Sequence, residues 1–79
     1  FAEKAGILLI KLVKKHVFED ANKRTTAIAF LLFLRRNSYE LTCDWQDLAN
    51  QILKIAQIDD NELNYQEIYQ WVNQVIHEN

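Results

Sequence analysis

Apolar residues recur along this chain at the three- and four-residue spacing that places them on one face of a helix. In the first such stretch the apolar positions are Phe1, Ala5, Leu8, Leu9, Leu12 and Val13. Comparable stretches follow it, separated by short polar connections. The pattern predicts four helices, at residues 1–15, about 22–36, about 44–56 and from 64 onward.

The second stretch differs from the others because residues 27–34 carry no polar side chain. A helix that is apolar on every side is normally enclosed by other helices. The predicted fold is therefore all-α, a small helical bundle around a buried central helix formed by residues 22–36. The polar connection before this helix is expected at residues 17–21.

Polar residues mark the ends of the later helices. Two pairs of residues have the spacing of an N-cap residue and a residue of the first helical turn. They are Asp44 with Asp47, and Asn64 with Glu67. Between the second and third helices, residues 39–42 are expected to form a short extended link. Each of the last two helices thus has a defined start in the sequence.

A glycine inside the first helix predicts a close contact. Gly6 costs about 1 kcal/mol relative to alanine at such a position, so it indicates a close crossing of two helices. The fourth helix is expected to run through Ile76, which leaves His77 at a frayed end without a partner. The large aromatic residues expected in the core are Phe30, Phe33, Trp45 and Trp71.

Length and composition narrow the class of protein. A chain of 79 residues, 49% hydrophobic and 25% charged, is expected to be one globular domain over residues 1–79. The single cysteine, Cys43, excludes an internal disulfide and indicates a reducing compartment, so a cytoplasmic protein is expected. No apolar run approaches the roughly 18 residues of a membrane span, which predicts no membrane partner. Because Phe1 begins inside a helical pattern, we expect a C-terminal fragment of a longer chain.

The charges are divided between the two halves of the chain. Residues 1–36 carry eight basic and three acidic groups, and residues 37–79 carry one basic and eight acidic groups, so the halves stand at +5 and −7. Of the basic groups, Lys11, Lys14 and Lys15 suit the C-terminal dipole of the first helix. The positive half would favour an anionic ligand.

The most unusual chemistry lies in residues 16–24, between the first two helices. The start of a helix presents unpaired N–H groups and a positive dipole, which together favour phosphate. Lys23 and Arg24 are cations near that start, where cations are normally disfavoured unless an anion binds there. Asp20 is a candidate Mg²⁺ ligand, and His16 can take a proton from a hydroxyl. These are the parts that phosphoryl transfer needs.

Each of these residues also has an ordinary structural interpretation. His16 alone would more often cap the first helix, and Asp20 or Asn22 alone would more often be an N-cap. Lys23 and Arg24 alone could be solvated surface cations. The residues taken singly leave both interpretations open.

The combination closely resembles the active-site motif of the Fic/Doc family, His-x-Phe-x-Asp/Glu-Gly/Ala-Asn-x-Arg. The matching residues are His16, Phe18, Asp20, Ala21, Asn22 and Arg24. The resemblance covers about residues 1–40. Fic proteins typically have Gly-Asn-Gly-Arg and a second arginine three residues later, whereas residues 21–24 read Ala-Asn-Lys-Arg and residue 27 is alanine. The chain is therefore most similar to the Doc (death-on-curing) toxin branch.

The resemblance implies an activity and a set of partners. Doc-type toxins transfer the terminal phosphate of ATP to a hydroxyl of elongation factor Tu, which arrests translation, and an antitoxin called Phd neutralises them. ATP and Mg²⁺ are thus the implied cofactors, with elongation factor Tu and a Phd-type antitoxin as partners. In the family the flap that docks the target precedes this region, so this chain on its own is expected to be weakly active or inactive.

The resemblance also implies a role for each motif residue. His16 would be the general base and Asp20 the Mg²⁺ ligand, while Phe18 would anchor the motif loop to the core. The residues implied to hold the nucleotide phosphates are Ala21, Asn22, Lys23 and Arg24.

Two other functions remain as alternatives. The first is Fic-type transfer of AMP to a protein hydroxyl, which Lys23 and Ala27 disfavour. The second is a non-catalytic helical interaction module that forms a homodimer through apolar surface on the first two helices. Nucleic-acid binding ranks last, because the basic groups have no interleaved aromatic residues and residues 37–79 are acidic.

Overall fold

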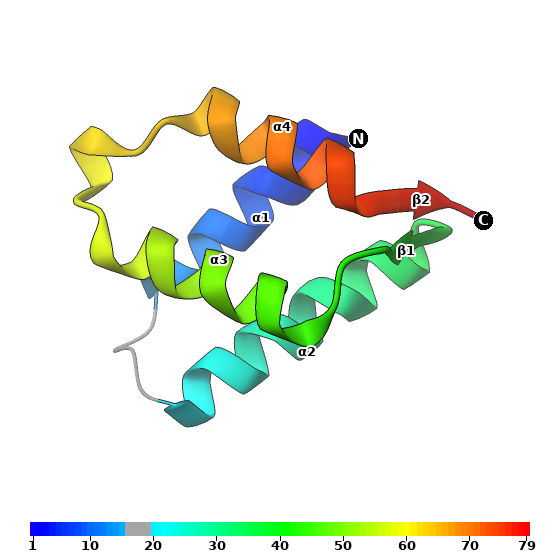
Figure 1. The fold of residues 1–79 in the computed structure, drawn as a ribbon, viewed down its shortest axis with the longest axis horizontal. Helices are drawn as coiled ribbons and strands as arrows, with labels where there is room; N and C mark the ends of the chain where they lie inside the picture. The colour runs from blue at the N-terminus through cyan, green and yellow to red at the C-terminus, as the bar shows by residue number, and fades with distance from the viewer. Residues whose placement is uncertain (16–19) are drawn as a thin grey trace.

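The structure, a computed structural model, describes residues 1–15 and 20–79, and for residues 20–22 it describes the backbone. The element order is α1 (Ala2–Lys15), α2 (Asp20–Arg36), β1 (Tyr39–Leu41), α3 (Trp45–Gln57), the short 3₁₀ helix η1 (Asp60–Glu62), α4 (Tyr65–Val75) and β2 (Ile76–Glu78) (Figure 1). The predicted small all-α bundle is confirmed. None of the helices within the described ranges is long and apolar enough to cross a membrane.

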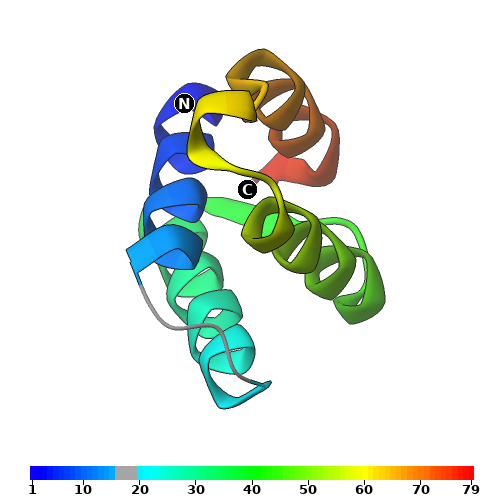
Figure 2. The same ribbon diagram turned by 90° about the vertical axis from the view of Figure 1, so that its left-hand side faces the viewer.

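The helices are arranged in two layers, with α1 and α2 in one and α3 and α4 in the other (Figure 2). Of these, α1 contacts all three other helices. Its buried residues are Ala5, Gly6, Leu9, Ile10 and Val13. The first helix, α1, is therefore the centre of the bundle.

The expectation that the second helix is enclosed on every side is wrong. Phe30 and Leu34 of α2 are buried, but Ile28 and Leu32 on its opposite face are 51% and 53% exposed. In the described part of the chain, α2 packs mainly against α1, α3 and β1. The apolar pattern alone could not show this, because it specifies which faces avoid water and not which elements cover them.

The second helix also begins earlier than expected. It starts at Asp20, so Asp20 and Ala21 belong to its first turn and not to the preceding connection. At its other end, the side-chain amide of Asn37 donates to the carbonyl of Phe33 at 2.8 Å. Ser38 follows with φ 65°, in the left-handed region that commonly ends a helix. The α2 helix therefore ends where the sequence indicated.

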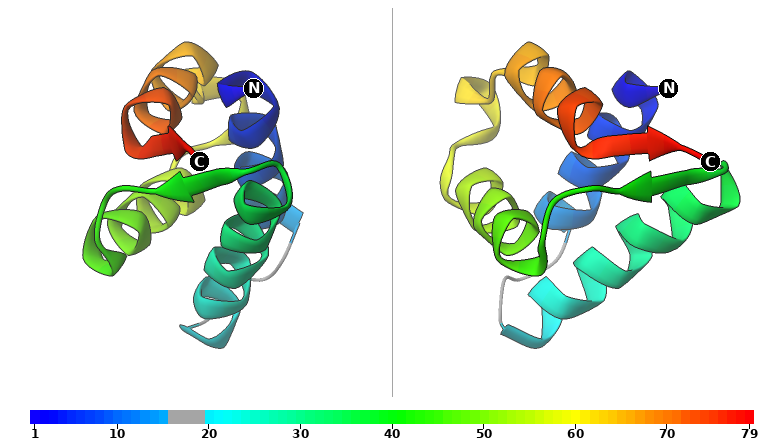
Figure 3. Two further views of the ribbon diagram at one scale, coloured as in Figure 1. Left: turned by 90° about the vertical axis from the view of Figure 1, so that its right-hand side faces the viewer. Right: turned by 45° about the vertical axis from the view of Figure 1, so that its right-hand side comes forward.

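The expected extended link is a β-strand that pairs with the end of the chain. β1 and β2 form a two-stranded antiparallel sheet in which Glu40 lies opposite His77 (Figure 3). The main-chain N–H of Thr42 extends this pairing by donating to Val75 at 2.6 Å. The prediction that α4 includes Ile76 and frays at His77 is therefore wrong, because strand pairing takes these residues out of the helix.

The predicted caps of the last two helices are confirmed. The Asp44 carboxylate accepts from the main-chain N–H of Asp47 at 2.9 Å, and the Asn64 side chain accepts from that of Glu67 at 3.1 Å. These bonds satisfy N–H groups that have no partner within the helix. They fix where α3 and α4 begin.

The aromatic core is smaller than predicted. Phe30 is fully buried, and Phe33 and Trp71 are half-buried against the core. Trp45 is 47% exposed, so its assignment to the core is wrong. Trp45 is the first residue of α3, and the buried face of that helix begins one turn later, at Leu48.

The close helix crossing predicted at Gly6 is confirmed. A Cβ atom at this position of α1 would lie 2.7 Å from Cδ1 of Tyr69 in α4 and 3.6 Å from Ile68. The first distance is shorter than van der Waals contact allows, so a side chain at position 6 would force the ring of Tyr69 or the helices to shift.

Replacing this glycine should therefore destabilise the fold. We expect Gly6→Ala to lower the free energy of unfolding by about 1–3 kcal/mol, the usual cost of adding a methyl group to a packed core. Urea denaturation followed by circular dichroism measures this change. The matched control introduces Gly6→Ala into a chain that already carries Tyr69→Ala. In that chain, Gly6→Ala should raise the free energy of unfolding by up to about 1 kcal/mol, because alanine has a higher helix propensity than glycine. An equal loss in both backgrounds would contradict the steric explanation.

Candidate functional site

The candidate site lies where the chain passes from the end of α1 to the start of α2. His16 and Phe18 lie outside the described residues. Asp20, Ala21 and Asn22 form the start of α2, and their side chains are outside the described part. Lys23 is half-buried at the end of the first turn, and Arg24 is exposed at the beginning of the second. The structure therefore places a helix start at Asp20, two residues before the predicted one, and describes two of the side chains predicted for the site.

This helix start combines two sources of positive potential. The start of any α-helix carries the positive end of the helix dipole and N–H groups that have no partner within the helix. Lys23 and Arg24 lie within two turns of the start of α2. Such an end binds phosphate, sulfate or carboxylate groups without further specialisation. Arg24 is exposed and can therefore reach an anion from solvent.

Buried residues directly after the motif anchor this end of α2. Thr26 is 2% exposed, and Ala27 and Phe30 have no exposed surface. Ala27 is part of the hydrophobic core, at the position where Fic proteins have their second arginine. Position 27 of this chain is therefore part of the packing between helices.

The end of α1 is attached to the opposite half of the molecule. The Lys14 ammonium donates to the main-chain carbonyl of Ile58 and lies 3.4 Å from a carboxylate oxygen of Asp60. The Lys14 side chain is 20% exposed, whereas that of Asp60 is 79% exposed. The sequence analysis assigned Lys14 to the dipole of its own helix. No sequence signal identified Ile58 or Asp60 as its partners, because they lie more than forty residues away.

The described side chains do not form a metal-binding site by themselves. Among them there is no group of three His, Cys, Asp or Glu residues that could hold a metal ion. The side chain of Asp20, the predicted Mg²⁺ ligand, lies outside the described part of the chain, so its role stays a prediction.

Cys43 is not a candidate nucleophile. Burial raises the pKa of its thiol above the usual value, and the neighbouring carboxylates of Asp47 and Asp44 raise that pKa further. The thiolate is the reactive form of cysteine, so Cys43 stays protonated and unreactive at neutral pH. It is half-buried against the hydrophobic core and contributes to packing.

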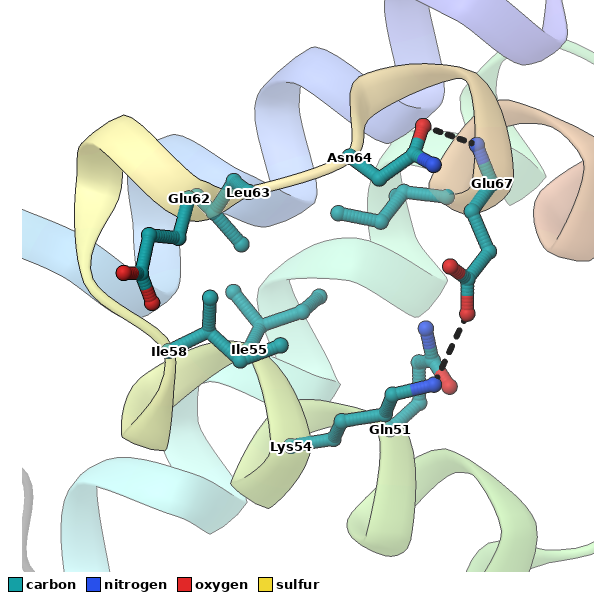
Figure 4. Close-up of a pocket in the computed structure, with 9 residues that line it drawn as sticks. Gln51, Lys54, Ile55, Ile58, Glu62, Leu63, Asn64 and Glu67 are labelled. Carbon is teal, nitrogen blue, oxygen red and sulfur yellow. Dashed lines mark hydrogen bonds and ion pairs between the residues drawn. The ribbon is translucent and has the colours of Figure 1, made fainter.

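A small hollow lies between α3 and α4 (Figure 4). Its apolar side is formed by Ile55, Ile58, Leu63 and Ile68, and its rim carries the ion pair between Lys54 and Glu67, whose charged atoms are 2.9 Å apart. The described residues that line this hollow all belong to the second half of the chain and include no candidate site residue.

The comparisons with known proteins agree with the motif over the first two helices. The family model described as Fic/DOC family matches residues 1–34. The matched region contains α1, the motif and most of α2, so over this region the chain is similar to the Fic/Doc family as a whole. No curated protein and no solved structure matches the chain.

The buried position of Ala27 generates a stability prediction. We expect Ala27→Arg to lower the free energy of unfolding by roughly 3 kcal/mol or more, because it forces a charge into a packed apolar site. The matched control is Ile28→Arg on the exposed face of the same helix, which should change stability by about 0.5 kcal/mol or less. Urea denaturation of both variants measures the difference. If the two variants had equal free energies of unfolding, position 27 would be open to solvent.

Proposed function

We propose that this chain is the motif-bearing part of a Doc-type toxin that transfers the terminal phosphate of ATP to a hydroxyl of a target protein. The observation that carries the proposal is the sequence at the start of α2. There, Ala21, Asn22, Lys23 and Arg24 follow Asp20 in the order typical of the Doc branch, on a helix start suited to phosphate. The family match over residues 1–34 supports the similarity to the Fic/Doc family on which the proposal rests.

The absence of a second arginine favours phosphate transfer over AMP transfer. Ala27 is fully buried and belongs to the core, so that position offers no cation for a nucleotide. Lys23 adds a positive charge where Fic proteins have glycine. We infer that this lysine changes how the phosphate chain of ATP lies along the helix start.

In the proposed reaction, His16 takes the proton of the target hydroxyl. The hydroxyl oxygen forms a bond to the terminal phosphorus of ATP, and the bond from that phosphorus to the bridging oxygen breaks, which releases ADP. Asn22, Lys23 and Arg24, together with the N–H groups at the start of α2, hold the phosphates. Asp20 would hold Mg²⁺, which neutralises phosphate charge when bound. Elongation factor Tu is the proposed target and a Phd-type antitoxin the proposed inhibitor.

The transferred group can be identified directly by mass. We expect the full-length protein, incubated with elongation factor Tu and Mg-ATP, to add one phosphate mass to the factor, as measured by mass spectrometry. His16→Ala should abolish the transfer, because it removes the base. The matched control is His77→Ala, which changes the only other histidine, an exposed residue of β2. Addition of the mass of AMP would instead establish Fic-type chemistry, and addition of neither mass would contradict the proposal.

A second experiment tests the phosphate-binding role of the helix start. We expect Arg24→Ala to weaken the binding of Mg-ATP by about tenfold or more, because a hydrogen bond to a charged phosphate is lost. Arg35→Ala is the matched control, since Arg35 is an exposed arginine in the last turn of the same helix. Isothermal titration calorimetry measures both affinities. Equal weakening by the two variants would indicate a general charge effect and not a site at Arg24.

A further inference from the structure

The hollow between α3 and α4 has the size of a small ligand site. In the described part of the chain, these two helices pack mainly against other helices and not against each other. A space of about 370 Å³, including its open mouth, remains between them. Small-molecule sites in proteins range from roughly 300 to 1,000 Å³, so the hollow can take a ligand at the lower end of that range.

The floor of the hollow is apolar and already formed. Ile55 and Ile68 belong to the hydrophobic core and are 1% and 5% exposed, and the half-buried Leu63 packs against that core. At the rim, the side chain of Asn64 accepts from the main-chain N–H of Glu67 at 3.1 Å, which fixes the start of α4. An aliphatic group that covers this floor would remove apolar surface from water, which is the main source of affinity at such a site.

Charged side chains lie on opposite sides of this floor (Figure 4). On one side, the Lys54 ammonium is 2.9 Å from a carboxylate oxygen of Glu67, so these two charges largely cancel. On the other side is Glu62, an exposed residue of η1 that also lines the hollow. Glu62 forms no ion pair with any other described residue. The mouth of the hollow therefore carries one uncompensated negative charge.

The segment that contains Glu62 adds to this negative potential. Asp59 and Asp60 precede Glu62 in the connection between α3 and α4. Lys14 lies 3.4 Å from a carboxylate oxygen of Asp60 and balances that charge, while Asp59 has no ion-pair partner among the described residues. A hollow with this charge distribution attracts cations and repels anions.

We propose that the hollow binds a small aliphatic amine. Its hydrocarbon part covers Ile55, Leu63 and Ile68, and its ammonium group lies at the mouth near Glu62. An alcohol of the same length gains the apolar contact alone, and a carboxylate of the same length is also repelled by Glu62. The proposal concerns the second half of the chain and does not rest on the proposed phosphate transfer.

A titration followed by nuclear magnetic resonance tests both the place and the charge preference. The probes are hexylamine, hexanol and hexanoate, which share one hydrocarbon chain and differ in charge at neutral pH. We expect hexylamine to bind with a dissociation constant on the order of 1 mM, the affinity usual for a ligand of this size. Hexanoate should bind about tenfold more weakly and hexanol with an intermediate affinity. The amide signals that shift should be those of Ile55, Leu63, Asn64 and Ile68.

One matched pair of variants assigns the preference to Glu62. Glu62→Gln, which changes an exposed residue and leaves the fold intact, should reduce the preference for hexylamine over hexanoate from about tenfold to about twofold or less. Hexanol should bind as before. The control Glu78→Gln removes the same charge from an exposed residue of β2 outside the hollow and should keep the tenfold preference.

The remaining outcomes would overturn the proposal. Equal binding of hexylamine and hexanoate would show that the hollow does not select cations. Equal loss of preference in Glu62→Gln and Glu78→Gln would show a general effect of net charge. Signal shifts confined to residues outside the hollow, or no binding of any probe, would show that the hollow is not a ligand site.

Discussion

The close approach of α1 and α4 at Gly6 is the constraint on which the rest of the fold depends. A Cβ atom there would lie 2.7 Å from Cδ1 of Tyr69, so any larger residue at position 6 would force the Tyr69 side chain or the helices to shift. This crossing helps to make α1 the centre of the bundle. It also places the end of α4 where Ile76–Glu78 can pair with Tyr39–Leu41, so the last residues of the chain are joined to the segment after α2.

A central α1 has a consequence for the candidate site. The helix that delivers the chain to the motif is packed against every other helix, and its last turn is also bonded through Lys14 to the connection after α3. On the other side of the motif, the buried residues Thr26 and Ala27 anchor the start of α2. The described turns before and after residues 16–19 are therefore both attached to other elements of the bundle.

The basic half and the acidic half of the sequence contribute different interactions to the fold. The basic half contains the helix start that suits phosphate, and the acidic half supplies Asp60 to Lys14 and Glu67 to Lys54. Both pairs involve exposed carboxylates, so each contributes little to stability by itself. Their effect is on geometry, since they connect α1 to η1 and α3 to α4. The acidic half therefore supplies carboxylates that pair with lysines of α1 and α3.

The sequence by itself determined the number of helices, the caps at Asp44 and Asn64, the close crossing at Gly6 and the identity of the motif. Each of these depends on spacing or on the chemistry of residues that are near one another in the chain. Only the tertiary structure decided which helix is central, that residues 39–41 and 76–78 form a sheet, and that Lys14 bonds to Ile58. These features join segments that are distant in sequence, and apolar periodicity shows which faces avoid water but not which partners cover them.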